Sequence, residues 1–187
     1  MKLYIAPGAC SQADHIALNE AGMEFDTVKV DIPTRKTEDG GEVTEINGKG
    51  YVPALAFEDG EVLTENAAIL AWVAQERPEL APEGPRGLVR LVEMLSFIGS
   101  EIHKPFIRAF VPTSDEDGEA ARETIAGRFD WLAGRLAGPY LFGERFTTAD
   151  AYLFVMLGWA AQMGMTCPGR SIHITSASPP VRPFSGR

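Results

Sequence analysis

The stretch YVPALAFEDGEVLTENAAILAWVAQERP, residues 51–78, carries the clearest folding signal in the chain. Two apolar runs are separated by Asp59-Gly60, a pair that favours the tight turn of a β-hairpin. The second run leads into a segment with helical spacing, and Pro78 ends that helix. The stretch therefore predicts a strand, a turn, a second strand and a helix, in that order.

The residues before this stretch predict a strand, a helix and another strand. KLYIA (2–6) is an apolar, branched run that stops at a Pro-Gly pair, and residues 11–21 have helical spacing with Ser11 as a candidate N-cap. FDTVKVDI (25–32) predicts the second strand, and residues 33–50 predict a long polar loop with one helical turn. The order β-α-β-loop-β-β-α over residues 1–77 predicts an α/β domain with a mixed sheet and helices on its faces.

The residues after this stretch predict an all-α domain. Residues 78–87 contain three prolines and two glycines and predict a linker. Residues 88–166 then repeat apolar residues with the period of a helix, and residues 147–164 are apolar nearly all round, as in a buried helix. Thr147 and Asp150 have the spacing of a capping box before that helix. The two apolar stripes are Leu88, Leu91, Val92, Leu95, Ile98 and Ile102, and Ile125, Phe129, Leu132 and Leu136.

The C-terminal segment differs from the rest of the chain in composition. Residues 167–187 hold four prolines, four serines and three arginines but no acidic residue, and they show no helical period. They predict an irregular tail.

Charge and composition exclude several classes of function. With 26 acidic and 17 basic residues the net charge is -9, so the chain repels phosphate backbones and we expect no nucleic-acid partner. No apolar run reaches the roughly 18 residues of a membrane span, and the N-terminus does not read as a signal peptide, which predicts a cytoplasmic protein without a membrane role. The three histidines have no metal-ligand spacing, so we expect no metal. No phosphate-binding glycine motif is present, so nucleotide binding has no support.

One cysteine lies where a strand, a turn and a helix meet. Cys10 is either a reactive thiol, whose thiolate the following helix N-terminus favours, or a small apolar residue at a turn. Its neighbour Ser11 either caps the helix or also donates a hydrogen bond to a sulfur. Cys167 lies far away in a different context, so both thiols are expected to be free.

Three further positions are candidate site residues, each with a structural alternative. The Val52-Pro53 bond is either trans, as most such bonds are, or a cis turn that aims backbone groups outward. The helix that starts at Glu65-Asn66 either binds a carboxylate through its free N–H groups or is simply capped by Asn66. His103 shares a helix face with small residues, which indicates the wall of a cleft or a plain surface histidine.

Four motifs together resemble the bacterial beta-class cytosolic glutathione transferases. They are MKLYIAPGACSQADHIALNEAG, INGKGYVPALAFEDGEVLTENAAI, FIGSEIHKPF and RFTTADAYLF, and they occur in the family's order over residues 1 to about 165. The resemblance implies a thioredoxin-like N-terminal domain (βαβ-ββα) followed by a helical C-terminal domain. Members continue with one or two more helices, so the tail at 167–187 is interpreted as a truncated or altered end.

The resemblance also implies roles for individual residues. Cys10 would lie beside the sulfur of glutathione with Ser11 next to it, and His103 would reach that sulfur from the helical domain. The Val52-Pro53 step would be a cis turn that holds the cysteinyl part of the ligand. The implied glutathione-binding residues are Ala9, Arg35, Lys36, Tyr51, Val52, Pro53, Glu65, Asn66 and Lys104, in which Glu65 and Asn66 receive the γ-glutamyl end and Arg35 or Lys36 the glycine carboxylate.

The function that follows from the resemblance is conjugation of reduced glutathione, as co-substrate, to small hydrophobic electrophiles in a cytoplasmic, detoxifying homodimer. Thiol–disulfide or peroxide chemistry through Cys10 is an accompanying hypothesis. Two alternatives stay open: a glutathione-binding protein without turnover, and a specialised glutathione-dependent dehalogenase, isomerase or reductase. The electrophile pocket is expected near Phe106, Phe110 and the tail.

Overall fold

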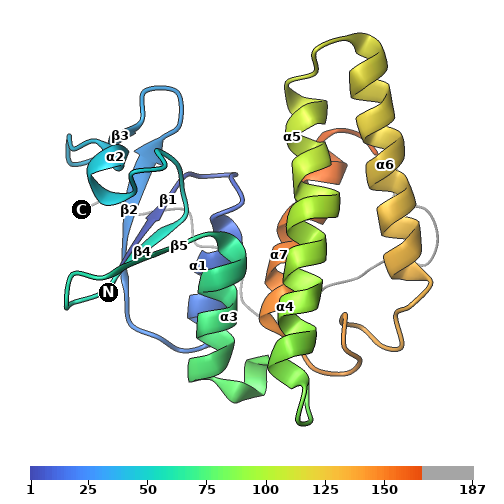
Figure 1. Ribbon diagram of the computed structural model, residues 1–187, viewed down its shortest axis with the longest axis horizontal. Coiled ribbons are helices and arrows are strands. Elements are labelled where there is room, and N and C mark those ends of the chain that lie inside the picture. The colour runs from blue at the N-terminus through green and yellow to red at the C-terminus, as the bar shows by residue number, and fades with distance from the viewer. Residues whose placement is uncertain (166–187) are drawn as a thin grey trace.

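The chain folds into two parts that lie side by side, a β-sheet with its helices and a group of longer helices (Figure 1). The computed structural model describes residues 1–165, so the predicted tail at 167–187 and its interpretation lie outside the described residues. Within the described part, no helix is both long enough and apolar enough to cross a membrane.

The first part is a five-stranded mixed sheet with the strand order β3-β2-β1-β4-β5. Strand β1 is parallel to β2 and antiparallel to β4, and β4 and β5 form the predicted hairpin. The order confirms the predicted thioredoxin-like arrangement of β-α-β followed by β-β-α. The elements are β1 (Lys2–Ile5), α1 (Gln12–Glu20), β2 (Asp26–Asp31), β3 (Lys36–Thr37), α2 (Val43–Ile46), β4 (Ala54–Ala56), β5 (Val62–Thr64) and α3 (Asn66–Glu76).

Two details of this part differ from the prediction. Residues 33–50 contain the expected helical turn α2 and also the short edge strand β3. The sequence did not predict β3, because a strand of two residues is too short to show a period. Ile32, expected as an apolar member of the second strand, lies beyond the end of β2 and is 57% exposed.

The second part consists of helices that run nearly continuously from α4 into α5 and then fold back as α6 and α7 (Figure 1). The predicted linker includes a short 3₁₀ turn, and the middle of the long helix is a π-helical segment that the period of the sequence does not show. The elements are η1 (Pro78–Leu80), α4 (Gly87–Phe97), the π-helical segment η2 (Ile98–His103), α5 (Lys104–Phe110), α6 (Asp115–Ala133) and α7 (Thr148–Gln162).

The apolar core runs without interruption from the sheet into the helices. Leu3 of β1, Leu70 of α3 and Leu153 of α7 belong to one buried cluster. On the opposite face of the sheet, Tyr4 and Val43 belong to a smaller cluster covered by α2. Because α1 packs on α7 and α3 packs on α4, the two parts share a core and hold a fixed relation to each other.

The first predicted stripe is buried only in part. Leu91, Leu95, Ile98 and Ile102 are fully buried, as predicted. Leu88 and Val92 are 38% and 42% exposed, so the stripe is not buried along its whole length. For Val92 the reason is geometric, because one position along a helix turns a side chain by about 100°, and Val92 lies one position beyond Leu91.

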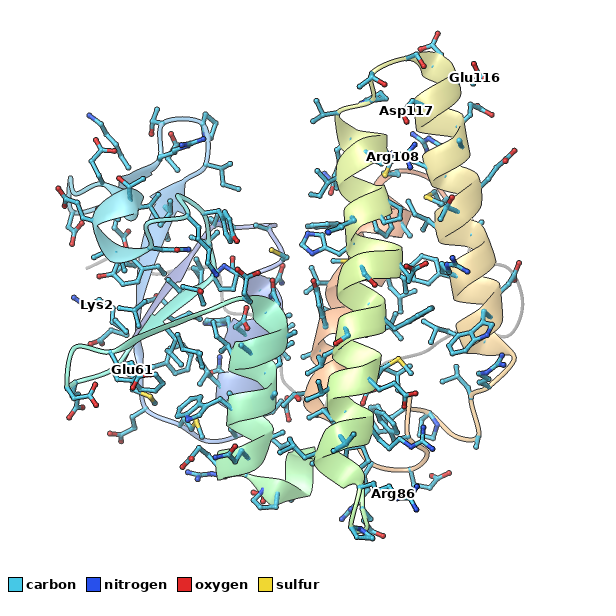
Figure 2. The ribbon with its side chains drawn as sticks, viewed as in Figure 1. Lys2, Glu61, Arg86, Arg108, Glu116 and Asp117 are labelled. Atoms are coloured by element: carbon cyan, nitrogen blue, oxygen red, sulfur yellow. The ribbon has the colours of Figure 1, made fainter. Side chains whose placement is uncertain are left out.

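One surface ion pair ties two helices of the second part together. The Arg108 guanidinium on α5 donates to the carboxylate of Asp117 at the start of α6 (Figure 2). Asp117 also accepts from the backbone N–H of Thr113, and the Arg108 contact is the main cause that lowers the pKa of Asp117 to about 2. Arg108 is therefore a bridge between α5 and α6.

Helix α7 begins at a buried polar cap. The carboxylate of Asp150 accepts hydrogen bonds from the backbone N–H of Thr147 at 2.8 Å, from the Thr147 hydroxyl at 2.7 Å and from the backbone N–H of Leu141 at 2.8 Å. Both Thr147 and Asp150 are buried. The predicted capping box is thus present, and it also anchors the loop that precedes the helix.

We predict that Asp150→Ala lowers the free energy of unfolding by about 3 kcal/mol, because two buried N–H donors lose their acceptor. Thr147→Ala removes the hydroxyl and the γ-methyl group but leaves the Asp150 carboxylate as acceptor of both N–H groups, and should cost about 1 kcal/mol. Ser114 is the matched control, because its hydroxyl accepts from the backbone N–H of Asp117 at the exposed start of α6. Its change to alanine should cost less than about 1 kcal/mol in the same urea titrations. Equal losses for Asp150→Ala and Ser114→Ala would contradict a structural role for the buried cap.

Candidate active site

Two adjoining chambers lie where the sheet part meets the helical part. Their volumes are about 380 and 700 Å³, within the range of small-molecule sites. The residues that line both chambers are Cys10, Tyr51, Val52, His103 and Ile107. Residues far apart in the sequence thus meet in one cleft, with Cys10 and His103 contributed by opposite walls.

The loop between β1 and α1 brings Cys10 to the cleft. Gly8, with φ of +76°, turns the chain there, and Ala9 also lines the smaller chamber. Ser11 does not reach the cleft. Its hydroxyl accepts from the backbone N–H of Ala6 at 3.1 Å, is fully buried and makes no capping hydrogen bond with α1. The predictions that Ser11 caps the helix and donates to a sulfur therefore do not agree with the structure, in which it holds the loop.

The electrostatics of Cys10 differ from the expectation of a favoured thiolate. Burial, followed by the nearby Asp14 carboxyl, raises the pKa of the Cys10 thiol to about 12. The thiol lies 3.9 Å from the backbone carbonyl of Val52, the direction of a weak S–H hydrogen bond. The start of α1 does not offset the burial, so Cys10 is a neutral thiol at physiological pH.

The side chain of Asn66 joins the starts of α1 and α3. Its amide donates to the backbone carbonyl of Cys10 at 2.9 Å and to the carboxyl of Asp14 at 2.8 Å. Asn66 is the first residue of α3 and not its N-cap, and no side-chain capping hydrogen bond is present, so the alternative in which Asn66 caps its own helix is wrong. Glu65 occupies the N-cap position, with φ of +75°, and makes no side-chain cap. The groups of α3 that are suited to bind a carboxylate are therefore the backbone N–H groups of its first turn.

Glu65 belongs to a charged cluster at one end of the cleft. Its carboxylate accepts from the Lys49 ammonium at 2.5 Å and from the Tyr51 hydroxyl at 2.7 Å, and these two hydrogen bonds lower the pKa of Glu65. Glu65 and Tyr51 line the larger chamber, as does Pro53, whose bond with Val52 is cis, as the resemblance implies. Lys49 was missed by the sequence reasoning, although it lies two residues before Tyr51 in the quoted motif.

The structure separates Arg35 from Lys36. Arg35 lines the smaller chamber, and its guanidinium lies 3.4 Å from the place a side chain on Gly50 would take. Lys36 lies on β3 and lines neither chamber. Of the two cations left open by the sequence, only Arg35 faces the cleft.

The opposite wall comes from the end of α4 and from η2, α5 and α7. His103 and Lys104 line the larger chamber together with the small residues Ser96 and Gly99, as the predicted cleft wall requires. Ile107, Phe110 and Trp159 line the smaller one. Phe106, expected near the electrophile, is instead fully buried and packs on Phe129 and Trp159. Trp159 carried no signal in the sequence, because its helix is apolar nearly all round.

His103 is neutral in this environment. Burial lowers its pKa from the ordinary 6.5 to about 4. Its Nδ1 lies 2.6 Å from the hydroxyl of Tyr152, and its ring packs edge-on against Trp159. Across the seam, the Trp159 indole N–H donates to the backbone carbonyl of Gly8 at 2.8 Å, which ties α7 to the loop that carries Cys10.

Comparison with known proteins shows the family to which the chain belongs. The chain matches the glutathione S-transferase N-terminal domain family over residues 8–76 and the glutathione S-transferase C-terminal domain family over residues 115–187. It is 38% identical over 174 residues to the glutathione S-transferase GstA of Escherichia coli O157:H7, across 90% of this chain and 87% of that protein.

Two solved structures give the same result. The ternary complex of BphK, a bacterial glutathione S-transferase, matches with a TM-score of 0.84 and 44% identity, over 89% of this chain and 86% of that one. A sphingomonad glutathione S-transferase in complex with glutathione matches with a TM-score of 0.82 and 49% identity, over 89% and 85%. The chain therefore belongs to the glutathione S-transferase family, and the enzyme class that this family defines is a transferase.

We predict that the neutral state of His103 makes folding sensitive to pH. Because its folded pKa of about 4 lies below the ordinary 6.5, the unfolded chain takes up the proton first, and stability falls as pH drops through that window. Between about pH 7 and pH 5 the wild type should lose about 2 kcal/mol more than His103→Gln, as measured by urea unfolding. Parallel pH curves for the two proteins would contradict the buried, neutral histidine.

Proposed function

We propose that this protein conjugates reduced glutathione to small hydrophobic electrophiles. The observation that carries the proposal is the cleft itself, in which groups suited to each part of glutathione follow one another along its length. Arg35 lies at one end, Cys10 and Val52 in the middle, and Glu65 with the start of α3 at the other end.

The chemistry of glutathione matches this order. It is a tripeptide with a carboxylate at each end, an ammonium group at the γ-glutamyl end and a thiol in the middle. In the proposed pose Arg35 pairs with the glycine carboxylate, Glu65 accepts from the ammonium group, and the first N–H groups of α3 hold the γ-glutamyl carboxylate. The backbone of Val52 then faces the cysteinyl part, which places its sulfur near Cys10 and His103.

The proposed reaction needs only the ligand's own sulfur as nucleophile. The glutathione thiol gives its proton to solvent, and hydrogen bonds from neutral donors such as Cys10 and His103 stabilise the thiolate left behind. A sulfur lone pair then forms the bond to the electrophilic carbon, and the leaving group departs with the electron pair of its own bond. Phe110, Ile107 and Trp159 give the electrophile an apolar surface beside the sulfur.

The position of Cys10 also supports thiol–disulfide exchange with glutathione as an accompanying activity. Its raised pKa predicts that this exchange is slow, because the thiolate is the attacking species. A glutathione-binding protein without turnover would keep the same cleft. A specialised glutathione-dependent enzyme would keep it too. Turnover separates the binding protein from the enzymes, and the reaction that is turned over separates the enzymes from each other.

We predict that glutathione at a hundred times its dissociation constant raises the free energy of unfolding by about 2.7 kcal/mol in a thermal melt. Conjugation of an aromatic halide should be detectable in the same preparation.

We also predict that Arg35→Ala raises KM for glutathione by about tenfold, because a hydrogen bond between charged groups is lost. Lys36→Ala is the matched control and should change KM less than twofold. A melt shifted by glutathione without conjugation would support the binding protein, and equal effects of the two variants would contradict the proposed pose.

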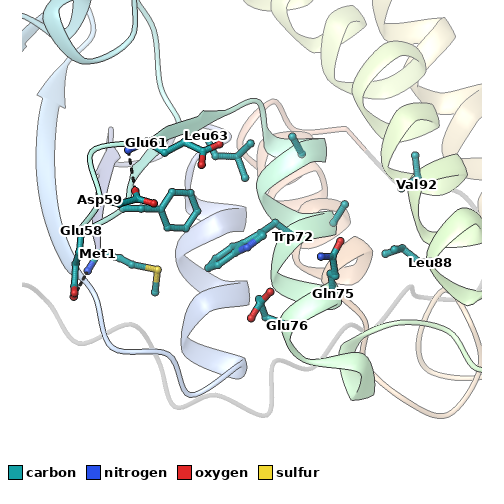
Figure 3. Close-up of a pocket in the computed structure, with 13 residues that line it drawn as sticks. Met1, Glu58, Asp59, Glu61, Leu63, Trp72, Gln75, Glu76, Leu88 and Val92 are labelled. Atoms are coloured by element: carbon teal, nitrogen blue, oxygen red, sulfur yellow. Dashed lines mark hydrogen bonds and ion pairs between the residues drawn. The ribbon is translucent and has the colours of Figure 1, made fainter.

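We also propose that the protein is a homodimer and that a second hollow marks the contact face. This hollow, of about 760 Å³, lies outside the site between the β4–β5 hairpin, α3 and α4 (Figure 3). Trp72 and Phe57, which line it, pack edge-on against each other, and Leu88 and Val92 line it from α4. Four carboxylates also line it (Glu58, Asp59, Glu61 and Glu76). In a two-fold pair, exposed Arg86 at the start of α4 is a charge partner for them.

For the dimer, we predict that Val92→Glu weakens association by at least tenfold, because it buries a charge in the apolar contact. Val111→Glu changes an even more exposed valine, 77% against 42%, that does not line the hollow, and should leave association unchanged. Sedimentation velocity over a range of concentrations measures both. A wild type that is monomeric throughout, or a Val92→Glu dimer as tight as the wild type, would contradict the proposed face.

The proposed cellular role follows from the proposed reaction. Removal of hydrophobic electrophiles is a detoxifying activity, and reduced glutathione as co-substrate suits a cytoplasmic setting.

A further inference from the structure

One buried hydroxyl at the cleft has no role in the reaction described so far. Tyr152, on α7, is only 3% exposed, yet its side chain reaches the larger chamber. Its hydroxyl oxygen lies 2.6 Å from Nδ1 of His103, and the two rings meet edge-on with their centroids 5.8 Å apart. Gly99, one turn before His103, lies beside this hydroxyl, because a side chain there would begin in ordinary van der Waals contact with it, at 3.8 Å.

Both members of this contact are uncharged. Burial lowers the pKa of His103 and raises that of the Tyr152 phenol, so each keeps its neutral form at physiological pH. After burial, the groups that also raise the pKa of the phenol are Cys10, in its ionised form, and the carboxyl groups of Asp14 and Glu65. A neutral imidazole carries one proton on either Nδ1 or Nε2, and the neighbour of one nitrogen decides which.

The direction of the hydrogen bond follows from the need to satisfy a buried hydroxyl. Among the described residues, Nδ1 of His103 is the hydrogen-bond acceptor that the phenol O–H reaches. If Nδ1 carried the proton and donated it to the phenol oxygen, the buried O–H would lose that acceptor. The phenol therefore donates to Nδ1, and the imidazole proton is on Nε2.

We propose that Tyr152 is a positioning residue that holds His103 in the Nε2–H tautomer, so that His103 presents a fixed hydrogen-bond donor to the sulfur in the cleft. The inference rests on the proposed function for the identity of that sulfur. The tautomer itself is a property of the free protein. The π-helical turn of η2 ends at His103, and the packing of its ring between Tyr152 and Trp159 fixes the ring as well as its proton.

The first experiment reads the tautomer without any ligand. In protein labelled with ¹⁵N-histidine, correlations between ring protons and ring nitrogens distinguish Nε2–H from Nδ1–H, and the loss of signals in His103→Gln assigns His103 among the three histidines. We expect Nε2–H in the wild type at neutral pH and a mixture of tautomers in Tyr152→Phe. Nδ1–H in the wild type, or an unchanged Nε2–H signal in Tyr152→Phe, would overturn the proposal whether or not glutathione binds.

The second experiment reads the consequence for the sulfur. The thiolate absorbance of the glutathione complex, followed against pH, gives the pKa of the bound thiol. Tyr152→Phe should raise that pKa by about one unit and lower kcat by about tenfold at a pH below it, because less of the ligand is ionised. KM for glutathione should change little. Tyr4→Phe, at a similarly buried tyrosine that lines neither chamber, should leave the bound thiol pKa and kcat as in the wild type.

Two substitutions of the histidine separate positioning from packing. A glutamine amide N–H takes the place of Nε2–H, whereas an asparagine amide takes the place of Nδ1. The bound thiol pKa should therefore be lower in His103→Gln than in His103→Asn by about one unit, a tenfold difference in ionisation. In the His103→Gln background, Tyr152→Phe should have no further effect on it. A Tyr152→Phe effect of the same size in both backgrounds would show that Tyr152 acts only through packing.

Discussion

The packing of α1 and α3 between the sheet and the longer helices is the constraint on which the rest of the structure depends. Each of these helices covers the sheet on one side and meets α7 or α4 on the other, so that one apolar cluster runs through both parts. The cleft lies along this seam, and its two walls come from different parts of the chain. The hydrogen bond from Trp159 to Gly8 crosses the seam beside Cys10 and fixes the distance between the walls.

Burial along the seam also decides where charge can lie. The middle of the cleft holds neutral groups, the thiol of Cys10 and the imidazole of His103, because desolvation disfavours their charged forms. The charged groups lie toward the ends, where solvent reaches Arg35 and the Lys49–Glu65 pair. A ligand with charged ends and a central thiol meets the same distribution. In the proposed complex, a thiolate formed in the middle receives the hydrogen bonds of neutral donors.

The cleft also carries costs that the surrounding packing must offset. Glu65 has a backbone conformation, φ of +75°, that residues other than glycine rarely adopt, and it persists because α3 and its charged neighbours hold it. Asp14 is fully buried, and its Oδ2 accepts a hydrogen bond from the side-chain amide of Asn66. Its other carboxyl oxygen, Oδ1, lacks a hydrogen-bond partner in the described part of the chain. Both positions support the start of α3, where the ligand's carboxylate is proposed to bind.

The sequence by itself determined the order of the elements and most of the residues that meet in the cleft. The Asp59-Gly60 turn, the periodicity of residues 88–166 and the four motifs predicted the hairpin, the helices and the family, because these signals are local and repeated. Cys10, Val52, Glu65 and His103 were placed in one site because the resemblance carried their roles.

Only the tertiary structure decided what is set by neighbours distant in the chain. In the structure Arg35, and not Lys36, lines the cleft, and Lys49 pairs with Glu65 at its end. The Ser11 hydroxyl bonds to the loop and not to the cleft, and burial raises the pKa of the Cys10 thiol. The tertiary structure also paired His103 with Tyr152, a residue inside a helix that is apolar nearly all round and carries no pattern of its own. Periodicity tells which residues are buried, whereas direction, protonation and hydrogen-bond partners depend on contacts that form only when the two parts pack together.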